Sequence, residues 1–183
     1  MNNYSDPYNN YQEPYNSNNN YDYYRNPCPH HNNMQMPYSD CYGNCIDLRD
    51  HGPNPYVVNI HEAADQNYNF RLALWTGMHL QLTLMNINAK DDIGLEMHPN
   101  ADQFISIEEG QGLVLMGPER DRLNFQQRVS PGYVIFVPAG TWHNLINTGC
   151  TPLKVYSIYA PPLHPFGVVQ RTKDDPEMGH NNY

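Results

Sequence analysis

Three residues in one short stretch have the types and spacing of metal ligands. Glu96 and His98 are separated by one residue, so in an extended strand their side chains point to the same side. A turn at 99–101 would then bring Gln103 back beside them. A carboxylate and an imidazole suit a Lewis-acid metal, whereas an amide is a weak neutral ligand. We therefore expect a polar site here, in which Glu96 either binds a metal or holds His98 in one tautomer.

A second stretch presents another histidine. Residues 133–137 are large and apolar, as in a buried strand, and Pro138-Ala-Gly140 follows them. Proline sets φ and glycine tolerates a positive φ, so the chain can reverse tightly at this point. His143 then opens the next strand, from which its side chain can point into whatever the sheet encloses.

The spacing of this second stretch carries a family resemblance. Gly132, Pro138, Gly140, His143 and Asn147 follow the pattern Gly-x5-Pro-x-Gly-x2-His-x3-Asn. The pattern resembles the second signature motif of the cupin family at every fixed position.

The stretch 90–110 resembles the first cupin motif in an altered form. His98 takes the position of the second motif histidine, and Gly110 closes the motif. Lys90, Glu96 and Gln103 stand where the family has glycine, histidine and glutamate, respectively.

The resemblance covers roughly residues 55–170 and implies an all-β cupin jelly-roll barrel, also called a double-stranded β-helix. Cupins bind a divalent metal (Mn, Fe, Zn or Ni among them) through these positions. The resemblance therefore implies a metal held by Glu96, His98, Gln103 and His143 inside the barrel. Glu96 is also the candidate catalytic carboxylate.

Two tyrosines are further candidates for the ligand pocket. Tyr156 and Tyr159 are three residues apart in one expected strand, so they lie on opposite faces of the sheet. One of them should pack inside, where its hydroxyl can touch a ligand. His164 lies in a proline-flanked segment and is expected to be structural.

The periodicity of the chain supports an all-β fold. Residues 59–66 read as one short helix, with Asn59 as its cap and Glu62 completing a capping box. Nine short strands are expected, with Gly, Pro, Asn or Asp between them. Their predicted ranges are 70–75, 79–88, 93–98, 103–109, 112–116, 124–129, 133–137, 143–147 and 153–159.

Composition divides the 183 residues into three parts. Residues 1–45 contain no Ala, Val, Ile, Leu, Phe or Trp, so 1–54 are predicted to be a disordered tail and linker. The cupin domain is assigned to 55–170, and 171–183 to a polar tail. The net charge is −9 and no basic run occurs, which argues against nucleic acid and membrane surfaces as partners. Because no apolar leader is present, a cytoplasmic location is expected, with the spore surface as the alternative.

The cysteines do not form a recognisable pattern. Cys28, Cys41 and Cys45 fall in the tail and Cys150 in the domain, which is not the framework of a small disulfide-stabilised core. A metal cluster of these tail cysteines with neighbouring histidines is conceivable, but free thiols are favoured.

Three functions remain open. The motif set is similar to mannose-6-phosphate isomerase-like cupins, which implies a metal-dependent isomerase acting on a small polar, sugar-like metabolite. A metal-dependent dioxygenase is the enzymatic alternative. The Tyr/Asn/Pro-rich tail resembles segments of spore-coat proteins, which favours a structural or binding cupin with assembly partners. A homodimer is expected in each case.

Overall fold

The computed structural model describes residues 45–178, and antiparallel strands dominate them. The single helix is α1 (Ile60–Gln66). The strands are β1 (Arg71–Thr76), β2 (Gln81–Ile87), β3 (Asp102–Glu109), β4 (Gly112–Gly117), β5 (Phe125–Val129), β6 (Val134–Val137), β7 (Trp142–Asn147), β8 (Leu153–Ala160) and β9 (Val169–Gln170).

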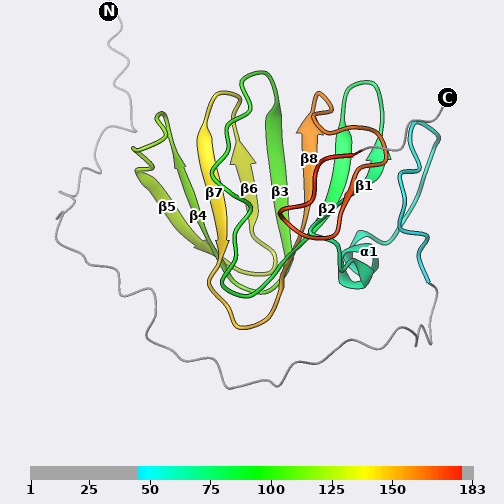
Figure 1. Cartoon of the computed structure of the whole chain (residues 1–183), viewed down its shortest axis with the longest axis horizontal. Helices are drawn as coiled ribbons and strands as arrows, with labels where there is room; N and C mark the ends of the chain where they lie inside the picture. The colour runs from blue at the N-terminus through cyan, green and yellow to red at the C-terminus, as the bar shows by residue number, and fades with distance from the viewer. Residues whose placement is uncertain (1–44, 179–183) are drawn as a thin grey trace, which may run out of the picture. The chain divides into compact units, whose positions relative to one another are not determined.

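The strands form two sheets. One has the order β6-β3-β8-β2-β1-β9, and the other has the order β5-β4-β7 (Figure 1). Buried residues of both sheets, such as Val155 and Leu145, belong to one apolar cluster, so the sheets face each other across a shared core. The crossovers between non-consecutive strands give the jelly-roll arrangement expected from the sequence, with two facing sheets rather than a closed barrel.

The interior of the larger sheet has an apolar half and a polar half. Ile107, Val155 and Met85 lie opposite one another in neighbouring strands and belong to the core. Nearer the other end of the same strands, the inward positions are polar and buried. We call this part the polar chamber; its residues are Gln81, Thr83, Gln103, Ser157 and Tyr159.

Helix α1 begins as predicted. The side chain of Asn59 accepts a hydrogen bond from the backbone N–H of Glu62 (3.4 Å). Glu62 returns the contact to the side-chain amide of Asn59 (2.7 Å) rather than to its backbone. Ala63 and Ala64 are buried, so the helix packs its small face against the sheet.

The predicted boundary at residue 54 differs from the structure. Residues 45–58, the covering segment, lie against the outer face of the larger sheet, where Ile46, Leu48 and Tyr56 pack on a cluster that includes Leu72 and Leu84. Exposure alternates along 45–50, as it does in an extended chain lying on a surface. The domain therefore includes residues that the composition assigned to a linker. The predicted disorder of 1–44 lies outside the described residues.

The predicted strand 93–98 is wrong, although its neighbours along the chain are confirmed. The stretch runs beside β7 and shares single antiparallel bridges with it, such as Glu96 with His143. Gly94 interrupts the ladder because it adopts φ +92° and its N–H turns to the carboxylate of Asp92 (2.9 Å). The two-residue strand β9 was not predicted, because it is too short to carry a pattern.

The cysteine prediction also needs correction. Cys45 and Cys150 are both disulfide-bonded, so Cys45 is not the free thiol that was favoured. Cys28 and Cys41 lie outside the described residues. No helix of residues 45–178 is long and apolar enough to cross a membrane.

Candidate metal centre

The Pro138–Gly140 turn positions both histidines of the site. Gly140 adopts φ +78°, and its N–H donates to the carbonyl oxygen of His98 (2.8 Å). Thr141 N–H donates to Pro138 O (3.1 Å), which closes the turn just before β7. His143 follows in β7 with only 1% of its surface exposed, so its ring is fixed inside the fold.

Glu96 is held opposite His143 by its backbone. Each residue donates its N–H to the carbonyl of the other, at 3.0 and 2.9 Å. His98 lies two residues further along and turns to the same side as Glu96, as the spacing predicted.

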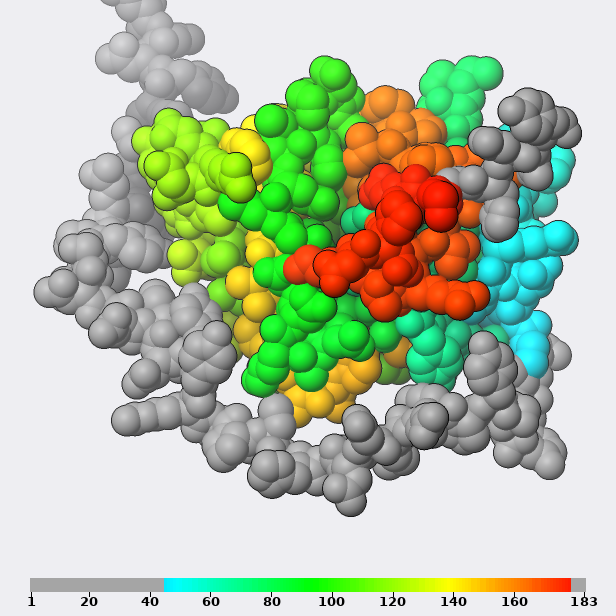
Figure 2. Space-filling view, viewed as in Figure 1, coloured from blue at the N-terminus to red at the C-terminus, as the bar shows by residue number. Residues whose placement is uncertain are grey.

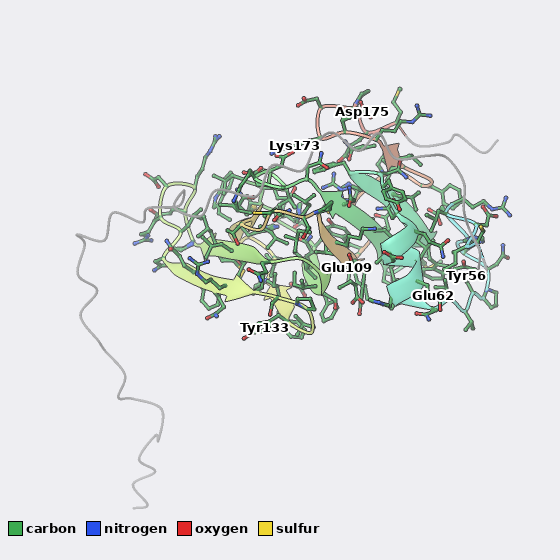
Figure 3. All side chains as sticks on the ribbon, turned by 90° about the horizontal axis from the view of Figure 1, so that it is seen from below. Tyr56, Glu62, Glu109, Tyr133, Lys173 and Asp175 are labelled. Carbon is green, nitrogen blue, oxygen red and sulfur yellow. The ribbon has the colours of Figure 1, made fainter. Side chains whose placement is uncertain are left out.

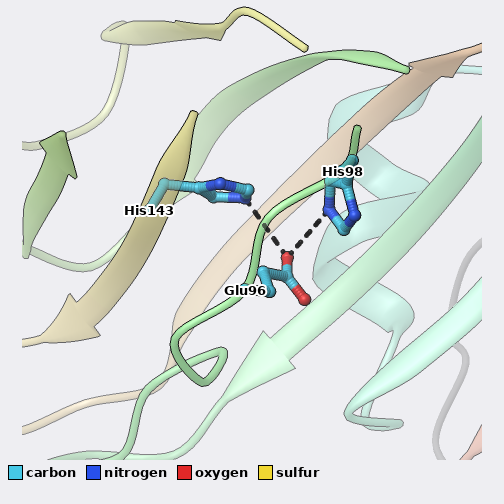
Figure 4. A group of neighbouring side chains, drawn as sticks. All are labelled: Glu96, His98 and His143. Atoms are coloured by element: carbon cyan, nitrogen blue, oxygen red, sulfur yellow. Dashed lines mark ion pairs between the residues drawn. The ribbon is translucent and has the colours of Figure 1, made fainter. Parts of the chain in front are cut away.

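The three side chains converge on one point (Figure 4). Glu96 Oε1 lies 3.4 Å from His98 Nε2 and 3.3 Å from His143 Nε2. Two atoms that each lie about 2.1 Å from a metal are about 3.0 Å apart at a right angle and about 3.4 Å apart at a tetrahedral angle. The separations therefore match those of atoms that share one metal ion.

The protonation of His143 fits the same role. Its Nδ1 lies 3.0 Å from the carbonyl oxygen of Thr141, which can only accept a hydrogen bond. Nδ1 therefore carries a proton. In the neutral ring Nε2 can bind a metal, whereas in the doubly protonated ring the Nε2 proton points at Glu96. Glu96 Oε1, His98 Nε2 and His143 Nε2 are all buried, and none has a well-aligned hydrogen bond to any residue of the described chain. Converging buried atoms without partners are what a divalent metal would satisfy.

Electrostatics keeps Glu96 ionised. Burial opposes its ionisation, but the imidazoles of His143 and His98 and the positive charge of Arg71 outweigh burial and lower the pKa of Glu96 to about 2. A carboxylate with so low a pKa is a good metal ligand across the neutral range.

Comparison with known proteins identifies the family. Residues 83–159, from β2 to β8, match the family described as "Cupin domain". This chain belongs to the cupin superfamily. The cupin is 62% identical over 128 residues to uncharacterized protein YrkC of Bacillus subtilis, covering 70% of this chain and 69% of YrkC. It is 42% identical over 115 residues to uncharacterized protein L612 of Acanthamoeba polyphaga mimivirus, covering 62% of this chain and 70% of that protein.

A solved structure supports the assignment. The crystal structure of BH2720 from Bacillus halodurans shares 60% identity with this cupin and superposes with a TM-score of 0.68. The alignment covers 69% of this chain and 96% of that chain. The predicted family and the all-β fold are thus confirmed.

The fourth predicted ligand, Gln103, lies in the polar chamber beside Tyr159. Its Nε2 donates to the hydroxyl of Tyr159 (3.0 Å), while its Oε1 is buried without a partner in residues 45–178. The Tyr159 ring lies 5.7 Å from the His98 ring, edge to face. Gln103 is therefore joined to the centre through Tyr159, and its free oxygen can still serve a metal or a ligand.

The two tyrosines separate as their spacing requires. Tyr159 is fully buried in the polar chamber, where burial raises its pKa well above the usual range and keeps the hydroxyl protonated. Tyr156 lies on the outer face, packed with Leu84 and tilted against Phe104 at 6.0 Å. The assignment of Tyr156 to the pocket is thus corrected, and that of Tyr159 remains.

Sequence reasoning did not predict Arg71 as an interior residue, and it assigned His164 only a structural role. His164 is buried and places its ring 4.8 Å from that of Tyr159. Arg71 is 4% exposed on the inner face of β1, within electrostatic reach of Glu96. The signal available in the sequence was an arginine at the start of an otherwise apolar strand, followed by Leu-Ala-Leu.

Proposed function

We propose that this cupin binds a divalent metal at Glu96, His98 and His143 and acts on a small polar, sugar-like metabolite as an isomerase. The observation that supports this most is the convergence of three buried ligand atoms at metal-ligand separations. A metal bound there would act as a Lewis acid toward a carbonyl or hydroxyl oxygen.

The lining of the polar chamber suits a hydroxylated ligand. Thr83 Oγ1, Ser157 Oγ and Gln103 Oε1 are buried without hydrogen-bond partners in the described part of the chain. Unpaired polar groups cost free energy in the apo protein, and the hydroxyls of a sugar-like molecule would satisfy them.

Interconversion of an aldose and a ketose requires a proton acceptor beside the metal. The acceptor removes a proton from the carbon next to the carbonyl and returns it to the former carbonyl carbon, while the hydroxyl proton moves to the former carbonyl oxygen. Figure 4 shows the second oxygen of Glu96 pointing away from both histidines, so one oxygen can bind metal while the other faces a ligand. The low pKa of Glu96 favours its ligand role, and proton transfer by Glu96 requires a substrate carbon acidified by the metal.

A dioxygenase is the second candidate, and the residue types of the cluster are the observation that supports it. Two histidines and one carboxylate with open positions resemble the facial triad of non-haem iron oxygenases. The identity of the bound metal and the consumption of oxygen distinguish this function from an isomerase.

The deciding measurement is metal content by elemental analysis of purified protein. We expect about one metal per chain, falling to about a tenth or less in His98→Ala and His143→Ala, because each change removes a ligand. His79→Ala, at an exposed histidine outside the cluster, is the matched control and should keep its metal.

Each outcome has a consequence. Iron that supports oxygen uptake would replace the isomerase by the dioxygenase. Metal that survives both histidine changes, or no metal at all, would contradict the proposal and leave a structural or binding cupin, including a spore-coat component.

A further inference from the structure

A charged group of this cupin lies inside the fold without being part of the metal centre. Arg71 Nη1 donates to Gln170 Oε1 and to Glu177 Oε1, both at 2.9 Å. The Arg71 side chain is 5% exposed, whereas that of Glu177 is 41% exposed. A buried guanidinium needs an anion, and here the anion comes from a residue at the surface.

His164 forms a hydrogen bond with the same oxygen. Its Nδ1 lies 3.1 Å from Glu177 Oε1 and donates to it, because a carboxylate can only accept. Gln81 fixes the backbone of His164 by accepting from its N–H (2.9 Å) and donating to its carbonyl (3.0 Å). Arg71 thus lies on β1 and the backbone of His164 is held by Gln81 of β2, whereas Glu177 is the more exposed partner.

Glu177 leaves some hydrogen-bonding atoms of Arg71 and His164 unused. Arg71 Nε and His164 Nε2 are buried and have no partner anywhere in residues 45–178. The first is a donor suited to a carboxylate oxygen. The second, with Nδ1 protonated, is an acceptor suited to a hydroxyl group. Burial and the nearby Arg71 lower the pKa of His164, which agrees with a neutral ring.

The pair adjoins the metal centre through Tyr159. The ring of Tyr159 contacts His164 on one side (4.8 Å) and His98 on the other (5.7 Å). The subsite and the candidate metal centre are therefore neighbours, separated by one ring.

Glu177 belongs to a segment that is fastened mainly by polar contacts. In residues 171–178, which we call the closing segment, Lys173 pairs with Asp91 (3.3 Å) and with Asp92. Asp175 accepts from the N–H groups of Arg171 and Thr172 (2.8 and 3.0 Å). Figure 2 shows this red segment on the surface, lying over the middle of the visible face. The surface ion pairs of the segment contribute little, so the main cost of releasing it is the lost contact of Glu177 with Arg71, which an incoming carboxylate would replace.

We propose that Arg71 and His164 form the subsite for the carboxylate of a small hydroxy acid or sugar acid, and that Glu177 occupies this subsite as a displaceable internal ligand. This inference rests on the proposed function for the position of the ligand's other end, and it specifies that the metabolite is an anion. The carboxylate takes the donors now shared by Glu177, and the hydroxyl end of the ligand points toward the metal centre.

The test is calorimetric titration of the full-length protein with glycolate, the smallest hydroxy acid, with ethylene glycol as the neutral probe. Glu177→Gln should bind glycolate on the order of tenfold more tightly than wild type, because a competing charged hydrogen bond is lost. Asp174→Asn removes one exposed charge from the same closing segment and should match wild type. Arg71→Gln in the Glu177→Gln background should abolish binding, with circular dichroism to verify its fold.

Equal affinity in Glu177→Gln and Asp174→Asn would overturn the inference, even if Arg71→Gln failed to fold. So would a preference for inorganic phosphate or ethylene glycol over glycolate. Metal content measured on the same samples separates the two proposals. Glycolate binding without metal would contradict only the proposed function, and metal without glycolate binding would contradict only the subsite.

Discussion

Glu96 affects both the candidate metal site and the stability of the folded chain. Its carboxylate would bind the proposed metal, and in the metal-free chain it lies between two imidazoles and within reach of Arg71. These neighbours stabilise the ionised form more than burial destabilises it. The charge therefore contributes to the stability of the folded chain and would also serve the proposed metal.

This predicts a pH dependence of stability in the metal-free protein. The pKa of Glu96 falls from 4.5 to about 2 on folding, so the unfolded chain binds more protons between these values. The stabilisation is complete above the unfolded pKa and is lost as the pH falls through 2. A shift of this size corresponds to about 3 kcal/mol or less.

Denaturant unfolding at pH values from 2 to 6 tests this prediction. The difference in unfolding free energy between wild type and Glu96→Gln should grow as the pH rises from about 2 to about 4.5 and stay constant above that. Glu119→Gln, at an exposed glutamate, controls for the loss of one negative charge. A difference that does not change with pH would contradict the role assigned to the neighbours of Glu96.

At the scale of elements, the turns at the motif positions determine where the candidate ligands lie. Gly110, Gly132 and Gly140 have φ values of +87°, +88° and +78°. Lys90, which replaces a motif glycine, has φ +70° and is the only described non-glycine residue with a positive φ. Lys90 thus adopts a backbone conformation that glycine accepts more readily than lysine does.

Lys90→Gly should therefore stabilise the protein. A left-handed conformation costs a residue with a side chain about 1 kcal/mol, which glycine avoids. The only described contact of the Lys90 side chain, Nζ to Thr148 O at 3.4 Å, is exposed and contributes little. Thermal unfolding should show an increase of about 1 kcal/mol in stability.

Gly132→Ala gives the opposite control, because a Cβ there meets nothing within 4 Å and only the backbone conformation is penalised. It should lose about 1 kcal/mol. Two changes of the same sign would contradict the conformational explanation.

At the scale of the whole described domain, the two segments at its ends have different roles. The covering segment buries apolar side chains on the outer face of the larger sheet. The closing segment makes polar contacts, with Lys173 and Asp175 on the opposite side of the molecule from Glu62 and Tyr133 (Figure 3). The first therefore contributes to folding, and the second is suited to controlling access.

Leu48→Ser tests the contribution of the covering segment. Leu48 packs on the cluster under this segment, whereas Val57 is 97% exposed. Leu48→Ser should lower the free energy of unfolding by about 1–2 kcal/mol. Val57→Ser should leave it unchanged in the same urea titration. Equal effects would show that the segment does not share the core of the domain.

Much of the fold could be predicted because local patterns repeat in the chain. Alternation and turn residues placed eight of the nine predicted strands, and Asn59 with Glu62 placed the helix. The prediction of a strand at 93–98 was wrong because Gly94 and Asp92 form a turn, which competes with backbone pairing to β7. The boundary at residue 54 was predicted wrongly because the few apolar residues of the covering segment become buried only against the larger sheet, which composition does not reveal.

The sequence by itself determined the family and the candidate ligands Glu96, His98 and His143, because motif spacing reflects local turns and strand alternation. Only the tertiary structure decided which tyrosine faces the chamber, that Cys45 and Cys150 are disulfide-bonded, and that Arg71, His164 and Glu177 meet. The reason is physical. These three side chains come from segments up to 106 residues apart, and their contact depends on sheet pairing rather than on any local pattern.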